Sequence, residues 1–74
     1  MTPKQAIVYK IIDEWWRMYG FAPSIDDVMK HTGDKGRANI HRIYQLLCAH
    51  GHCRMTPRKA RSIRPVSLRM RDIE

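Results

Sequence analysis

The stretch GFAPSIDDV, residues 20–28, separates two helices and sets the organisation of the chain around it. Gly20 is the residue type that most readily takes the left-handed conformation found directly after a helix, so we predict that a first helix ends there. Ser24 and Asp27 have the spacing of a capping box, in which each side chain accepts a hydrogen bond from the other residue's backbone N–H. We therefore predict that a second helix begins immediately after Ser24.

The segment before this stretch has the features of a complete helix. A capping box also lies at its start, with Thr2 as the N-cap, Gln5 three residues later, and Pro3 at the first helical position, which tolerates proline. Its apolar residues recur at spacings of three and four, the pattern of one buried helical face: Val8, Ile11, Ile12, Trp15, Trp16 and Tyr19.

The segment after the stretch predicts the rest of the second helix and a third one. Gly33 ends the second helix, and the third begins after Gly36 and ends at Gly51. The inward stripe of the third helix consists of Ile40, Ile43, Tyr44 and Leu47. Its opposite face is polar but almost free of acidic residues, which is unusual for a helix surface that only faces water.

Beyond Gly51 the pattern changes to that of a small hairpin. Residues 52–55 and 62–66 alternate loosely between apolar and polar, and a basic tip joins them. We predict a mainly α fold with a small β-hairpin, a three-helix winged helix-turn-helix, over residues 1–66, and a frayed basic tail over 67–74. The predicted core consists of Val8, Ile12, Trp16, Val28, Ile40, Ile43 and Leu47.

The distribution of charge indicates a polyanionic partner. The 74 residues carry a net charge of +7, yet residues 1–34 hold four basic and five acidic side chains, whereas residues 35–74 hold ten basic and two acidic ones. Positive charge gathered in one half of a small domain offers a surface to nucleic acid. A face that serves only solubility is the alternative, but interspersed charges of both signs would suffice for that.

The residue types of the third helix and the hairpin match those that contact double-stranded DNA. Arginine can pair with guanine through two hydrogen bonds and asparagine with adenine, while a small alanine permits close approach. Basic residues of a hairpin tip would meet phosphates or enter a minor groove. The predicted DNA-binding residues are Lys35, Arg37, Ala38, Asn39, His41, Arg42, Gln45, Arg54, Arg58, Lys59 and Arg61.

Residues spread from Thr2 to Val66 resemble, without a gap, the DNA-binding domain of the LexA repressor family. They are Thr2, Lys4, Gln5, Val8, Tyr9, Ile11, Ile12, Gly20, Pro23, Ser24, Asp27, Val28, Gly33, Leu47, Gly51, Ser62, Ile63 and Arg64. The resemblance implies a transcriptional repressor that reads operator DNA with the start of its third helix. Well-known members have a serine, an asparagine and two glutamates there, where this chain has Gly36, Ala38, His41 and Arg42, so the operator sequence does not transfer. The family's second domain, which dimerises and cleaves itself with a serine–lysine pair, lies outside the resemblance.

Cysteine and histidine residues raise two further possibilities, a zinc site and a catalytic nucleophile–base pair. Cys48, His50, His52 and Cys53 crowd together, but their spacing matches no common structural zinc site, and they straddle a helix end and a strand start. We therefore expect packing or surface positions, with no metal and no cofactor. A nucleophile–base pair would need an orienting acid that nothing nearby supplies, so we expect no enzyme.

The adjacent Trp15 and Trp16 cannot both be buried equally by one helix. The more exposed one either rests on its own domain or, with Tyr19, contacts a second copy in a weak homodimer or another protein. A contact with another protein would favour an alternative function for the chain, a protein-interaction module that docks on a nucleic-acid-handling complex. No apolar run is long enough for a membrane span or a signal peptide, so we expect a cytoplasmic protein.

Overall fold

The computed structural model describes residues 1–56 and 62–66. In these residues three helices precede a two-stranded antiparallel sheet: α1 (Pro3–Tyr19), α2 (Ile25–Thr32), α3 (Arg37–Ala49), β1 (Cys53–Arg54) and β2 (Arg64–Pro65). This order confirms the predicted winged helix-turn-helix. None of the helices in the described ranges is long and apolar enough to cross a membrane. The predicted tail, residues 67–74, lies outside the described residues.

Both capping boxes form as predicted. At the start of α1, Thr2 Oγ1 accepts from the Gln5 backbone N–H at 3.2 Å, and Gln5 Oε1 accepts from the Thr2 N–H at 3.3 Å. At the start of α2, Ser24 Oγ accepts from the Asp27 N–H at 3.1 Å, and Asp27 Oδ2 accepts from the Ser24 N–H at 2.9 Å. Each box satisfies N–H groups that a helix start leaves without partners.

Glycines end the first two helices, but the third ends earlier than predicted. Gly20 and Gly33 take left-handed conformations, with φ of 77° and 78°, directly after α1 and α2. Helix α3 stops at Ala49, and Gly51, with φ of 80°, forms the turn that leads into β1. The left-handed residue therefore redirects the chain here after the helix has already ended.

The core lies between the three helices and the hairpin. Its buried apolar side chains are Val8, Ile12, Ala22, Val28, Ile40, Tyr44, Leu47, Cys53 and Ile63. Five of the seven predicted core residues are among them. Trp16 and Ile43 are only partly buried, because they pack against the rim of this cluster. The predicted core list lacked the other four, Ala22, Tyr44, Cys53 and Ile63, although Tyr44 had been assigned to the inward stripe of the third helix.

The hairpin is shorter than the alternating pattern predicted. Its strands have two residues each, with Cys53 opposite Pro65 and Arg54 opposite Arg64. Pro65 has no N–H to donate to a ladder, which limits the pairing. One further backbone bond, from Val66 N to His52 O at 3.0 Å, continues the contact beyond the strands.

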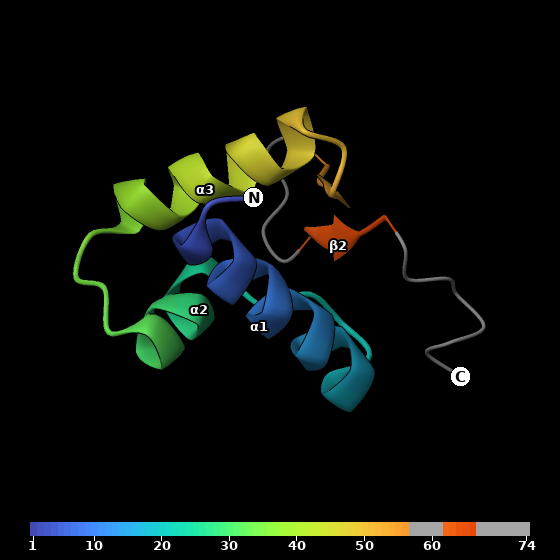
Figure 1. The fold of residues 1–74 in the computed structure, drawn as a ribbon. Coiled ribbons are helices and arrows are strands. Elements are labelled where there is room, and N and C mark those ends of the chain that lie inside the picture. The colour runs from blue at the N-terminus through green and yellow to red at the C-terminus, as the bar shows by residue number, and fades with distance from the viewer. Residues whose placement is uncertain (57–61, 67–74) are drawn as a thin grey trace.

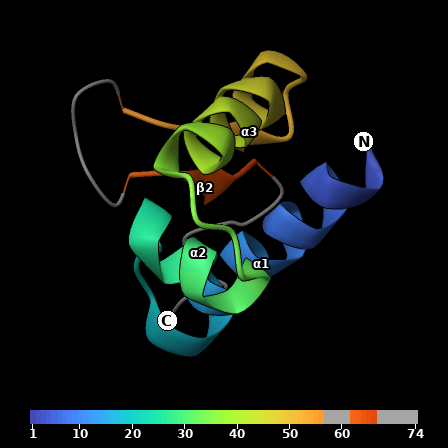
Figure 2. The ribbon, with the colours of Figure 1, turned by 90° about the vertical axis from the view of Figure 1, so that its left-hand side faces the viewer.

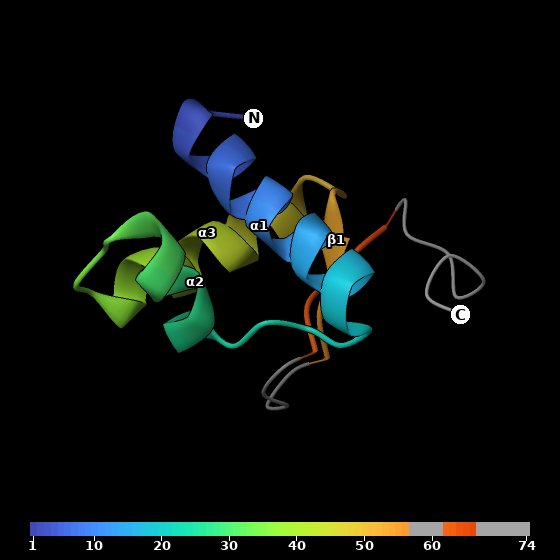
Figure 3. The same cartoon turned by 90° about the horizontal axis from the view of Figure 1, so that it is seen from below.

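The arrangement leaves one side of α3 uncovered. In Figure 1, α3 lies above α1 and α2, and Figure 2 shows the same order with α3 seen nearly along its axis. Seen from below in Figure 3, α1 and α2 lie in front of α3. The turn that joins α2 to α3 and the hairpin lie at opposite ends of α3 (Figure 1).

Candidate nucleic-acid interface

The outer face of α3 presents the side chains that the sequence predicted for DNA binding. Ile40, Tyr44 and Leu47 face the core, with exposures between 0% and 3%. The predicted contact residues of this region are all exposed: Lys35, Arg37, Ala38, Asn39, His41, Arg42 and Gln45. Helix α3 contains no aspartate or glutamate. The structure thus leaves all of these side chains exposed, and α3 itself adds no negative charge among them.

Buried contacts hold α3 against the helix before it. Tyr44 packs in the core, and its hydroxyl donates to the Ser24 carbonyl at 3.5 Å. Burial raises the pKa of Tyr44 above its ordinary value of 10.0, so the phenol stays protonated and keeps its donor. The N-cap of α2 and the middle of α3 are therefore connected.

A polar cluster fixes the turn between α2 and α3. Thr32 Oγ1 donates to Asp34 Oδ2 at 2.8 Å, and Lys4 Nζ lies 2.7 Å from the same carboxylate oxygen. The Lys4 ammonium, followed by the Thr32 hydroxyl, lowers the pKa of Asp34 below 3.8. These contacts attach the turn to the start of α1 and so set the direction in which α3 leaves it.

An ion pair crosses from the first turn of α2 to the first residue of α3. Arg37 Nη1 donates to both carboxylate oxygens of Asp26, at 2.8 and 2.7 Å. Sequence reasoning placed Arg37 among the DNA contacts but did not identify Asp26 as its partner, because the two residues are eleven positions apart and lie on different helices.

The hairpin adds positive charge next to α3. Arg54 is exposed on β1, and the register places Arg64 directly opposite it. Residues opposite each other in an antiparallel pair lie on the same face, so the hairpin places these two arginines side by side. Arg64 was not among the residues predicted to contact DNA. The predicted tip residues Arg58, Lys59 and Arg61 lie outside the described residues.

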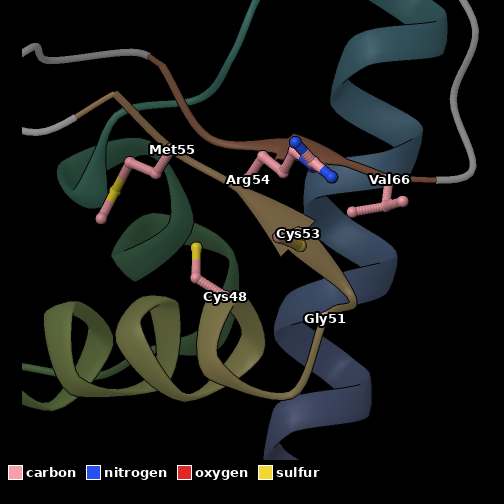
Figure 4. Close-up of a pocket in the computed structure, with 6 residues that line it drawn as sticks. All are labelled: Cys48, Gly51, Cys53, Arg54, Met55 and Val66. Carbon is pink, nitrogen blue, oxygen red and sulfur yellow. The ribbon is translucent and has the colours of Figure 1, made fainter.

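A hollow of about 460 Å³ lies between the end of α3 and the hairpin (Figure 4). It is lined by Cys48, Gly51, Cys53, Arg54, Met55 and Val66. Burial raises the pKa of Cys53 to about 12 and also raises that of Cys48, so both thiols are protonated at neutral pH. A protonated thiol is a poor nucleophile and a poor metal ligand. In residues 1–56 and 62–66, no three His, Cys, Asp or Glu side chains group closely enough to hold a metal ion.

The two tryptophans have different surroundings. Trp16 Nε1 donates to the Ile63 carbonyl at 2.8 Å and so joins α1 to the hairpin. Trp15 instead packs among rings, with centroid distances of 4.6 Å to Tyr19, 6.2 Å to Phe21 and 6.0 Å to His31. Among the described residues, its buried Nε1 has no hydrogen-bond partner. Both tryptophans are partly buried, but Trp16 packs against the core cluster, whereas Trp15 belongs to a cluster of rings with Tyr19, Phe21 and His31.

The comparison with known proteins agrees with the resemblance read from the sequence. No protein-family model matches the chain. It is 29% identical over 68 residues to the LexA repressor of Rhodospirillum rubrum, a match that covers 92% of this chain and 27% of that repressor. The chain thus spans about a quarter of its relative's length. Over nearly all of its own length, this winged helix-turn-helix is similar to a LexA repressor.

Proposed function

We propose that the chain binds double-stranded DNA sequence-specifically, as a transcriptional repressor that places α3 in the major groove. The observation that carries the proposal is the outer face of α3, where exposed hydrogen-bond donors lie together without an acidic residue on the helix. The net charge of +7 and the similarity to a LexA repressor support it. We propose that the chain acts by binding DNA, as the similarity to a LexA repressor suggests.

Residues of α3 supply the sequence preference, and basic residues around it supply the affinity. Asn39 and Arg42 are exposed and can each make paired hydrogen bonds to a base edge. We assign phosphate contacts to Lys35, in the turn before α3, and to Arg54, on β1; such contacts fix orientation but carry no sequence information. Arg58, Lys59 and Arg61 of the hairpin tip complete the proposed set.

Salt dependence of DNA affinity tests the electrostatic part. If Arg37, Arg42, Arg54 and the three basic residues of segment 58–61 each neutralise a phosphate, log K against log salt falls with a slope of about −0.9 per contact, or about −5 in total. Fluorescence anisotropy with a labelled duplex at several salt concentrations measures it. A slope near zero would refute the proposal.

Alanine variants test which residues read the sequence. Starting from a duplex selected from a random pool, Asn39→Ala or Arg42→Ala should cost about 1–3 kcal/mol and flatten the preference at one or two base pairs. Lys59→Ala is the matched comparison and should weaken all duplexes about equally, because lysine acts as a point charge. An unchanged preference in both Asn39→Ala and Arg42→Ala would place the recognition face elsewhere.

We also propose that two copies pair weakly through the C-terminal end of α1, because one helix-turn-helix reads too few base pairs to select a single site. The surface there is apolar: Met18 is 72%, Tyr19 52% and Phe21 45% exposed, and the rings of Tyr19 and Phe21 pack against Trp15. Stable interfaces bury about 1,200–2,000 Å² and use about 20–30 residues on each side, and this patch offers only a few exposed side chains. Pairing should therefore be detectable mainly on DNA with two half-sites.

Sedimentation with and without a two-half-site duplex tests the pairing. Met18→Gln should reduce cooperative binding, while Ile7→Gln, which alters a 52% exposed apolar residue on the same helix, is the matched control. A strict monomer without cooperativity would instead favour the alternative function, in which this surface docks on a protein of a nucleic-acid-handling complex.

A further inference from the structure

The ion pair between Asp26 and Arg37 occupies a position that matters for DNA binding. One guanidinium nitrogen, Nη1, holds both carboxylate oxygens at 2.7–2.8 Å, and both side chains remain exposed, at 64% for Arg37 and 59% for Asp26. Of the other ion pairs that join two described residues, two lie within α1 and one joins α1 to the turn after α2. This pair therefore differs from them in joining the two helices of the helix-turn-helix.

The Asp26 carboxylate and a DNA phosphate are chemically similar ligands for the Arg37 guanidinium. A carboxylate offers a guanidinium two negatively charged oxygens, as a phosphate does, so the two ligands compete for the same donors. Arg37 is the first residue of α3, the end of the helix that the proposed function directs toward the groove. Asp26 thus occupies Arg37 donors that a phosphate at that end would take.

The strength of the pair is in the range in which exchange is possible. Exposed ion pairs between side chains contribute little, since water and salt screen them. DNA concentrates phosphates along its backbone, and neutralising them releases condensed counterions. The pair is therefore weak enough for a phosphate to displace the Asp26 carboxylate from Arg37.

We infer that Asp26 is a built-in competitor for DNA at Arg37, so that binding exchanges the carboxylate for a phosphate and the protein binds every duplex less tightly than its basic surface would allow. This inference rests on the proposed function. It assigns to Asp26 an effect opposite to that of the contact residues, because its removal strengthens binding. The free protein then carries one basic side chain of α3 in a neutralised state until DNA is present.

The experiment compares four proteins on one duplex by fluorescence anisotropy: the parent, Asp26→Asn, Arg37→Gln and the double variant. Asp26→Asn should bind about two- to five-fold more tightly, the range expected when an exposed ion pair no longer has to be broken. In the Arg37→Gln background the same substitution should give less than half of this gain. Glu14→Gln is the matched control, because it removes one carboxylate from an exposed pair with Lys10 on α1, and it should leave the affinity nearly unchanged.

Each outcome decides between competition and its alternatives. Weaker binding by Asp26→Asn would mean that Asp26 positions Arg37 for DNA, and an undiminished gain in the Arg37→Gln background would mean a general charge effect; either overturns the inference. Thermal melts followed by circular dichroism verify that all variants are folded at the assay temperature, since Asp26 also lies in the first turn of α2. A parent that binds no duplex refutes the proposed function, whereas a parent that binds, with no gain in Asp26→Asn, refutes only the inference.

Discussion

The hydrogen bond from Trp16 to the hairpin should be a main attachment of the wing to the helices. Trp16 Nε1 donates to the Ile63 carbonyl at 2.8 Å across 47 positions of the sequence, and the Ile63 residue is only 1% exposed. Trp16→Phe keeps an aromatic ring on α1 but removes the donor. We expect this single change to loosen the hairpin without altering the secondary structure of α1.

The loss of stability expected for Trp16→Phe depends on how far the Ile63 carbonyl is buried. A protein hydrogen bond contributes about 0.5–1.5 kcal/mol, and leaving a buried acceptor without a partner raises the cost toward about 1–3 kcal/mol. That is a large part of the roughly 5 kcal/mol at the lower end of domain stability. In a domain of this size each kcal/mol lowers the Tm by roughly 4–8 °C.

The neighbouring tryptophan provides the control. Trp15→Phe also removes an indole N–H, but this one has no acceptor among the described residues, so its loss should cost less than about 0.5 kcal/mol. Urea unfolding and thermal melts of both variants, followed by circular dichroism, measure the difference. Equal destabilisation by the two substitutions, or none by Trp16→Phe, would refute the role assigned to this bond.

Three further perturbations test the packing and the titratable groups. Leu47→Ala removes a fully buried side chain from α3 and should cost about 2–5 kcal/mol in urea unfolding; a Tm within a degree or two of the parent would remove Leu47 from the core. The raised pKa of Cys53 means that folding favours the neutral thiol, so stability should be fully present below pH 9 and be lost progressively toward pH 12, a loss that Cys53→Ala should reduce. The lowered pKa of Asp34 means that folding favours its charged carboxylate. The contribution of Asp34 to the free energy of unfolding should therefore be present above pH 3.8 and disappear on further acidification, and melts of Asp34→Asn should lack this pH dependence.

The limits of α1 and α2 and the exposed face of α3 could be predicted from the sequence alone. Helix starts depend on contacts between residues three positions apart, such as Ser24 with Asp27, and helix ends on the conformational freedom of single residues such as Gly20. Apolar spacing likewise showed that Ile40 and Leu47 face the core, which leaves the opposite side of α3 to solvent. All of these features are local, so the residues that determine them are neighbours in the chain.

The length of the hairpin and the partners of individual side chains were decided only by the tertiary structure. Trp16 was predicted as a core residue, but it is only partly buried, and its indole N–H donates to the Ile63 carbonyl of the hairpin. Arg37 was predicted as a DNA contact, and its pairing with Asp26 emerged only when α2 and α3 were placed together. Periodicity shows which side of a helix is buried, but not which distant residue will meet a given side chain. That choice depends on how the elements pack, because a hydrogen bond or ion pair forms only where packing brings its two groups within about 3 Å.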